Sequence, residues 1–191
     1  MAKVLVVYGS RHGGTQGIAE RIGEVLTSEG LEARVESAEH VRDIGAPDAV
    51  VIGSGVYMGR WLDAPVTFVE RHAAELASRP VWLFSSGPVP SGSAPMEEAD
   101  HMEAFGPAEG PGSGGRKKLD ELIALTHPRG HKVFLGAFDP DDPPKAMSER
   151  LARMLPAVKK ILPTGDFREW PVIEAWAREI AAAIKGVPVP A

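Results

Sequence analysis

The densest group of potential anion-binding residues in this sequence is the stretch 9–15, GSRHGGT. It follows an apolar, β-branched run, Lys3–Tyr8, which has the composition of a buried strand. It precedes a helical pattern that Thr15 opens and Gly30 ends. In such a strand–loop–helix unit, the free N–H groups and the positive dipole end of the helix bind phosphate. The predicted phosphate-binding residues are Ser10, Arg11, His12, Gly13, Gly14 and Thr15.

The loop lacks the features of the two common nucleotide-binding motifs. A Walker A loop needs a lysine after its second glycine, but Thr15 and Gln16 follow Gly14 here. A dinucleotide fingerprint needs G-x-G-x-x-G, and Arg11 takes the place of the middle glycine. Hydroxyls, an imidazole and backbone amides remain, and these favour one phosphate monoester held without a metal. An ordinary tight strand-to-helix turn is the alternative.

Two further loops follow predicted strands and carry groups suited to a flat ring. Aromatic side chains close to a phosphate site suggest a planar heterocycle at the other end of the ligand. Serine hydroxyls and loop amides could bind the polar edge of that ring. The candidate residues in the first loop are Gly55, Val56, Tyr57, Met58, Gly59, Arg60 and Trp61. Those in the second loop are Ser85, Ser86, Gly87 and Pro88. For Trp61, a core position at the start of the next helix is the alternative.

Strand and helix patterns alternate along the chain, which favours a parallel sheet with helices on both faces. Right-handed crossovers would bring the loops after the strands to one edge, where ligands of open α/β sheets bind. After the first strand, the predicted strands are Glu32–Glu36, Ala49–Gly53, Val81–Phe84 and Val133–Phe138. After the first helix, the predicted helices are Trp61–Leu76, Lys117–Leu125, Lys145–Leu162 and one that follows Pro171.

We predict one domain over residues 1–186, with a loop insertion at 87–115 and a C-terminal tail at 187–191. The insertion is rich in glycine, proline and serine, which fits disorder, a lid or a structural loop. Residues 139–144, DPDDPP, predict an acidic turn. The helix that follows has a basic face over residues 145–160. That face is either solvated or suited to a partner or a membrane surface.

The composition excludes several classes of site. The chain has no cysteine, so thiolate nucleophiles, disulfides and cysteine–metal centres are absent. A net charge of −5 argues against nucleic acid as a partner. His127 and His131 are separated by proline and glycine, so they do not form a helical metal-binding pair. The sequence shows no signal-peptide pattern and no apolar run of membrane-spanning length, so we expect a cytoplasmic protein. We also expect no bound metal.

The phosphate loop resembles that of flavodoxins, whose pattern is [ST]-x-T-G-x-T. Ser10, Gly13 and Thr15 match this pattern, and His12 replaces a threonine. The stretches GSGVYMGRW, RPVWLFSSGP and GDFREW look like the branch that includes menaquinone-dependent protoporphyrinogen dehydrogenases. This resemblance implies a doubly wound, five-stranded parallel sheet in the order 2-1-3-4-5. It also implies that FMN is the cofactor, with its phosphate on Ser10–Thr15 and its ring between the other two loops. The flavin would carry the electrons, so no catalytic side chain is expected.

The leading functional hypothesis is an FMN-dependent oxidoreductase linked to a quinone, with protoporphyrinogen as a candidate substrate. The net charge of −5 is mild compared with that of acidic electron shuttles. The basic 145–160 face could approach an anionic inner membrane surface, where quinones reside. The acidic start of DPDDPPKAMSER would, however, repel the propionates of a porphyrinogen. The alternatives are a one-electron carrier with a protein partner and a descendant that has lost the flavin.

Overall fold

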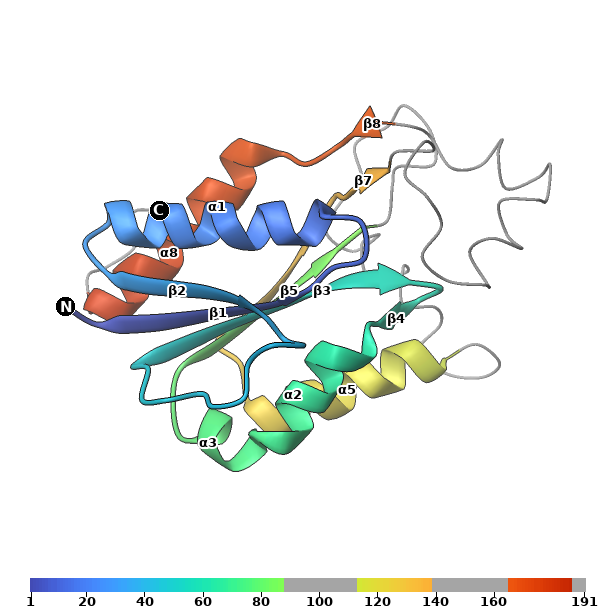
Figure 1. Cartoon of the computed structure of the whole chain (residues 1–191), viewed down its shortest axis with the longest axis horizontal. Coiled ribbons are helices and arrows are strands. Elements are labelled where there is room, and N and C mark those ends of the chain that lie inside the picture. Colours follow the sequence, from blue (N-terminus) through green and yellow to red (C-terminus); the bar gives the residue numbers. More distant parts are fainter. Residues whose placement is uncertain (88–112, 139–164, 187–191) are drawn as a thin grey trace.

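The computed structural model describes residues 1–87, 113–138 and 165–186, and a parallel sheet forms its centre (Figure 1). The main path of the sheet runs β2-β1-β3-β5-β6. Because β4 pairs beside β3 and lies off this path, the predicted order 2-1-3-4-5 is confirmed. The parallel strands are β1 (Lys3–Gly9), β2 (Glu32–Ser37), β3 (Ala49–Tyr57), β5 (Val81–Ser86) and β6 (Gly130–Phe134).

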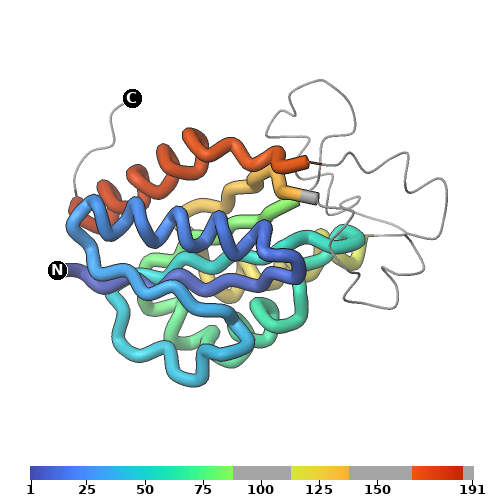
Figure 2. Tube along the Cα trace, turned by 45° about the horizontal axis from the view of Figure 1, so that its top comes forward, coloured from blue at the N-terminus to red at the C-terminus, as the bar shows by residue number. Residues whose placement is uncertain are grey.

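Helices cover both faces of the sheet, as Figures 1 and 2 show. One face carries α1 (Gly14–Ser28) and α8 (Trp170–Lys185). The other carries α2 (Asp63–Arg71), α3 (Ala73–Ala77) and α5 (Gly114–Thr126). Along β1, Val4 and Val6 pack in the first layer, whereas Leu5 and Val7 pack in the second. Side chains alternate across a strand, so a run that is apolar at every position is what a sheet buried on both faces requires.

The pairing register brings the carboxyl ends of neighbouring strands to the same level. Gly9 at the end of β1 lies opposite Ser54 of β3, and Ser54 lies opposite Ser85 of β5. Ser86 then lies opposite Phe134 at the end of β6. The loops that leave these strands therefore start side by side along one edge.

The segment after β3 is the main departure from the predicted elements. The strand continues to Tyr57, turns at Met58–Gly59 and returns as β4 (Arg60–Trp61), which is antiparallel to β3. Met58 has φ 50° and Gly59 has φ 73°, the left-handed pair that a tight two-residue hairpin turn requires. The expected loop is thus a hairpin, and the helix expected from Trp61 begins at Asp63. That helix is interrupted at His72, after which α3 begins.

The end of the chain differs in similar ways. The fifth strand ends at Phe134, and Ala137–Phe138 forms β7, which pairs antiparallel with β8 (Gly165–Asp166). The last residues of the predicted 87–115 insertion belong to α5. Residues 88–112 of that insertion, the predicted 139–144 turn, the 145–162 helix with its basic face and the 187–191 tail lie outside the described residues. In the described part of the chain, no helix is long and apolar enough to span a bilayer.

Candidate functional site

The phosphate loop ends at an α1 N-terminus that has no side-chain cap. Gly13 is the N-cap residue, with φ 81°, and it makes no side-chain cap bond to the first turn. The first backbone bond of the helix runs from Gly17 N–H to Gly13 O at 2.9 Å. A Cβ added to Gly13 would meet nothing within 4 Å, so space beside the loop is open. An αL glycine, open space and uncapped amides fit a bound phosphate.

Tyr57 joins the phosphate loop to the hairpin. The Arg11 guanidinium lies 4.8 Å from the centre of the Tyr57 ring, and the His12 ring lies 6.3 Å from it. A Cβ on Gly55 would lie 2.9 Å from the Tyr57 ring and 3.1 Å from Thr15 Oγ1. The structure therefore brings together residues from two of the loops singled out in the sequence.

The tip of the hairpin points outward and its base packs on α5. Met58 is 92% exposed. Arg60 lies against the start of α5, because a Cβ on Gly114 would be 3.0 Å from its Nη2. A Cβ on Gly115 would overlap the Gly59 carbonyl oxygen. The glycine pair at the start of α5 thus allows the helix to approach the backbone of the turn.

Trp61 and Ser85 are interior residues. Trp61 is 7% exposed, and its Nε1–H donates to Ser85 Oγ at 2.8 Å. Ser85 Oγ also shares a hydrogen bond with His131 Nε2 at 2.9 Å. Burial, followed by the charge of Arg116, lowers the pKa of His131 to about 4. These bonds join the hairpin to β5 and β6 in the interior, and the role of Trp61 and Ser85 as ring contacts stays a prediction.

The end of β5 presents backbone rather than exposed side chains. Ser86 is 5% exposed, and Gly87 has φ 81° while its N–H donates to Phe134 O at 3.0 Å. A Cβ on Gly136 would be 3.1 Å from Gly87 Cα, so the two backbones approach closely. Val56 is partly buried at the end of β3. Pro88 lies outside the described residues.

Arg168 lies beside the phosphate loop and was not among the predicted site residues. Its Nε and Nη2 donate to the two Asp166 carboxylate oxygens at 2.8 and 2.6 Å. Its Nη1 donates to Gly14 O at 3.3 Å. The bond from Arg168 lowers the pKa of Asp166. The stretch GDFREW gave a signal in the acid–x–arginine spacing, but only the fold places it against the loop.

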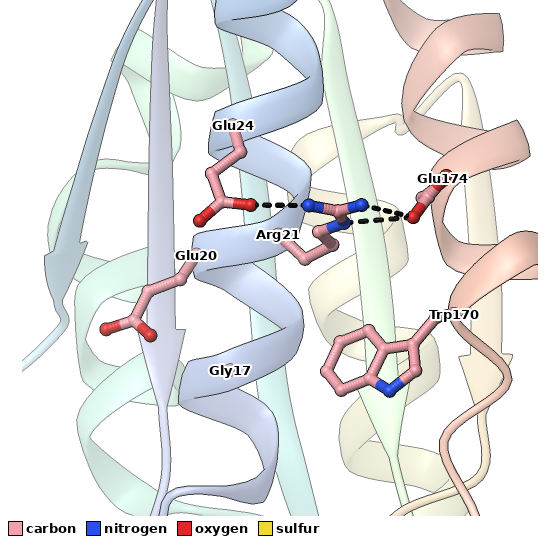
Figure 3. Close-up of a pocket in the computed structure, with 6 residues that line it drawn as sticks. All are labelled: Gly17, Glu20, Arg21, Glu24, Trp170 and Glu174. Atoms are coloured by element: carbon pink, nitrogen blue, oxygen red, sulfur yellow. Dashed lines mark hydrogen bonds and ion pairs between the residues drawn. The ribbon is translucent and has the colours of Figure 1, made fainter.

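A groove of about 460 Å³ lies between α1 and α8, next to this region (Figure 3). At its centre, Arg21 donates to Glu24 at 2.8 Å and to Glu174 at 2.5 and 3.0 Å. Hydrogen bonds from Arg21, and then from Arg178, lower the pKa of Glu174. Arg21 joins glutamates of both helices across the groove, so we interpret the groove as the seam between two helices. Its lining residues are Gly17, Glu20, Arg21, Glu24, Trp170 and Glu174.

Among the residues that the structure describes, no group of three or more His, Cys, Asp or Glu side chains could hold a metal ion. The donors around the phosphate loop are nitrogen-bearing side chains and backbone amides, which suit an anion.

Comparison with known proteins agrees with this architecture. Residues 5–142 match the family model described as Flavodoxin domain. A flavodoxin from the domain Archaea is 18% identical, with 96% of this chain and 99% of that chain covered and a TM-score of 0.55. A flavodoxin from Pseudomonas aeruginosa is also 18% identical, with the same coverage and a TM-score of 0.57.

A larger protein contains the same fold as one part. Rubredoxin oxygen:oxidoreductase from Desulfovibrio gigas is 14% identical, with 96% of this chain and 36% of that chain covered and a TM-score of 0.58. At these identities the solved structures establish the fold, whereas the family model covers most of this chain. The protein therefore belongs to the flavodoxin-domain family, whose cofactor is FMN.

Proposed function

We propose that this protein is an FMN-dependent oxidoreductase that delivers electrons to a quinone. Its FMN phosphate would bind at Ser10–Thr15, on the uncapped amides of α1 and the Thr15 hydroxyl. The ring would lie between the hairpin residues 55–60 and the backbone of Ser86–Gly87. When bound, FMN supplies reversible electron transfer. The residues of the chain bind it, orient it and set the charge around it.

The fit of the chain to FMN rests on its donor set. Gly13 holds the αL conformation that turns the chain into α1, and the first turn of that helix has no side-chain cap. No acidic residue occupies the first turn of α1, so an added dianion meets no fixed negative charge there. Arg11, stacked on Tyr57, adds a cation to the same loop.

The observation that carries the quinone proposal is the charge at the described part of this edge. Arg11 and Arg60 lie beside the loops that would hold the cofactor, whereas Asp166 offsets the charge of Arg168. An electron shuttle that docks on a basic protein needs a negative field around its cofactor. Arginines here oppose that field, and an uncharged quinone pays no electrostatic penalty for approaching them. The acidic run DPDDPP disfavours protoporphyrinogen, with its propionates, as the electron donor.

A one-electron carrier is the second candidate, and Met58 is the observation that favours it. This side chain is 92% exposed at the tip of the hairpin. An exposed, adaptable apolar side chain next to a cofactor is suited to contact with a protein partner. The carrier would use this tip to dock its partner.

The experiment compares the two acceptors directly. The FMN-loaded, desalted protein is reduced anaerobically and mixed with a short-chain naphthoquinone or with cytochrome c in a stopped-flow instrument. For an oxidoreductase, the rate with quinone should saturate as its concentration rises, because a complex forms before electron transfer. Free reduced FMN is the control for direct reaction in solution.

A matched variant separates the candidates further. Met58→Gln should change the rates with quinone and with cytochrome c by the same factor if quinone is the acceptor, because Met58 would then act only through the bound ring. A carrier would instead show a linear, slow reaction with quinone and a slower reaction with cytochrome c in the variant. If the protein retains no FMN, both candidates fail.

A further inference from the structure

Arg168 is fixed in place by contacts on all sides of its guanidinium group. It forms a bidentate ion pair with Asp166, and its Cζ lies 4.5 Å from the centre of the Trp170 ring. Its side chain is only 17% exposed. A planar group held by a bidentate carboxylate and an aromatic face has little rotamer freedom left. The direction of the remaining nitrogen, Nη1, is therefore fixed, and this nitrogen donates a hydrogen bond to Gly14 O.

The carbonyl that accepts the hydrogen bond from Arg168 belongs to the Gly14–Thr15 peptide, at the end of the phosphate loop. In a trans peptide unit the C=O and N–H groups point in opposite directions, so the Gly14 carbonyl and the Thr15 N–H move together. In the first turn of a helix, the N–H groups point out of the N-terminus. A donor on the carbonyl side therefore fixes the direction of an amide that would bind phosphate, and it polarises that amide as well.

Gly17 is the position that allows this contact. A Cβ added to Gly17 would lie 2.6 Å from Arg168 Nη1. Glycine is otherwise unfavourable inside a helix. Its presence in the first turns of α1 is explained if the space beside it is needed for the guanidinium group.

Arg168 precedes α8 and is one of several links between α1 and the C-terminal part of the chain, and it lies closest to the loop. Arg21 bonds to Glu174 further along α1, and Lys185 Nζ bonds to Glu29 at 3.1 Å at the far end of the helices. The latter two links attach the helices without reaching the first turn. This arrangement provides matched controls within the same seam.

We propose that Arg168 is a positioning residue that orients the first turn of α1 and makes the site prefer FMN over riboflavin. This inference rests on the proposed binding of the FMN phosphate at Ser10–Thr15. The net positive charge of the guanidinium group is offset by Asp166, so the effect is chiefly geometric. Without Arg168 the ring site would remain and the phosphate site would loosen.

The test measures the dissociation constants of FMN and riboflavin by flavin fluorescence for wild type, Arg168→Ala and Gly17→Ala. Both variants should bind FMN about tenfold more weakly, the effect of losing one charge-assisted hydrogen bond. Riboflavin, which has no phosphate, should bind within about twofold of wild type. Gly17→Ala tests the same contact with Arg168 still present, because the new methyl displaces its guanidinium group.

Riboflavin serves as an internal control for folding, since a variant that is merely destabilised would lose affinity for both flavins. Arg21→Ala and Lys185→Ala should leave the ratio of the two constants unchanged. If Arg168→Ala and Gly17→Ala keep the wild-type ratio, or if Arg21→Ala shifts it equally, the inference is wrong. If wild type binds FMN no better than riboflavin, the proposed phosphate site fails and the inference fails with it.

Discussion

The phosphate loop and the β3–β4 hairpin lie at the same edge of the sheet, yet they are built differently. The phosphate loop is one continuous stretch whose donors are backbone groups and whose shape depends on an αL glycine at Gly13. The hairpin is anchored to other elements through its own Trp61, which bonds to Ser85 of β5, and Ser85 in turn bonds to His131 of β6. The local part of the site is therefore encoded by neighbouring residues, and the other part by residues distant in sequence.

The largest expected effect concerns the hairpin and is a dependence of stability on pH. His131 has a folded pKa of about 4, below its usual 6.5, so the unfolded chain binds more protons between these values. Its contribution to stability is complete above pH 6.5 and decreases as the pH falls towards 4. We expect a loss of roughly 3 kcal/mol over this range. Urea unfolding at several pH values measures it.

His131→Gln supplies the comparison, because its side chain keeps a polar group near Ser85 but does not titrate. The difference in unfolding free energy between wild type and this variant should shrink as the pH falls from 7 to 4. A constant difference over that range would show that His131 is not held neutral by its surroundings.

The second largest effect on stability is expected at the contact between α5 and the turn of the hairpin. In Gly115→Ala the new Cβ would overlap the Gly59 carbonyl, and neither backbone can move freely. We expect a destabilisation of about 2 kcal/mol, measured by urea unfolding. Gly114→Ala is the matched control, since its Cβ would meet only the flexible end of Arg60. Equal effects of the two substitutions would contradict a specific helix–turn contact.

A smaller effect is expected at the phosphate loop. Gly13→Ala places a side chain at φ 81°, which should cost about 1 kcal/mol of strain, although no atom lies in its way. Gly13→Asn should recover part of that loss, because asparagine tolerates the αL region. Thermal unfolding of the three proteins gives the order. If alanine proves as stable as glycine, the loop can form without an αL residue.

The smallest effect on stability is expected for Arg60, whose side chain is exposed on the hairpin. Arg60→Ala should change the unfolding free energy by less than about 0.5 kcal/mol. It should nevertheless lower the reduction potential of bound FMN, because a nearby cation favours the negative charge gained on reduction. Arg60→Lys should restore most of the potential. An unchanged potential in the alanine variant would place Arg60 away from the ring.

Much of the fold could be predicted because its signals are local. The apolar runs at Lys3–Tyr8 and Val81–Phe84 mark strands buried on both faces, and both lie within the observed β1 and β5. The phosphate loop was predicted from adjacent glycine, serine and threonine residues. Its chemistry depends on the free amides of one helix, which a stretch of sequence can reveal by itself.

The hairpin was missed because its turn competes with a helix pattern. Leu62, Val66 and Val69 have helical spacing, and the pattern was extended back to Trp61. The structure begins the helix at Asp63 instead, since Trp61 forms a ladder pair with Val56 and a hydrogen bond to Ser85. Tertiary contacts thus decided a boundary that periodicity could not.

By itself, the sequence predicted a parallel sheet and a phosphate-binding loop, because both predictions rest on burial patterns and backbone chemistry within short stretches. The strand order came from the resemblance of three such stretches and the phosphate loop to flavodoxins. Only the tertiary structure decided that Trp61 and Ser85 lie inside the protein and that Arg168 lies against Gly14. These contacts join residues separated by long stretches of chain. The direction of a side chain across such a distance is set by packing, and no local pattern specifies it.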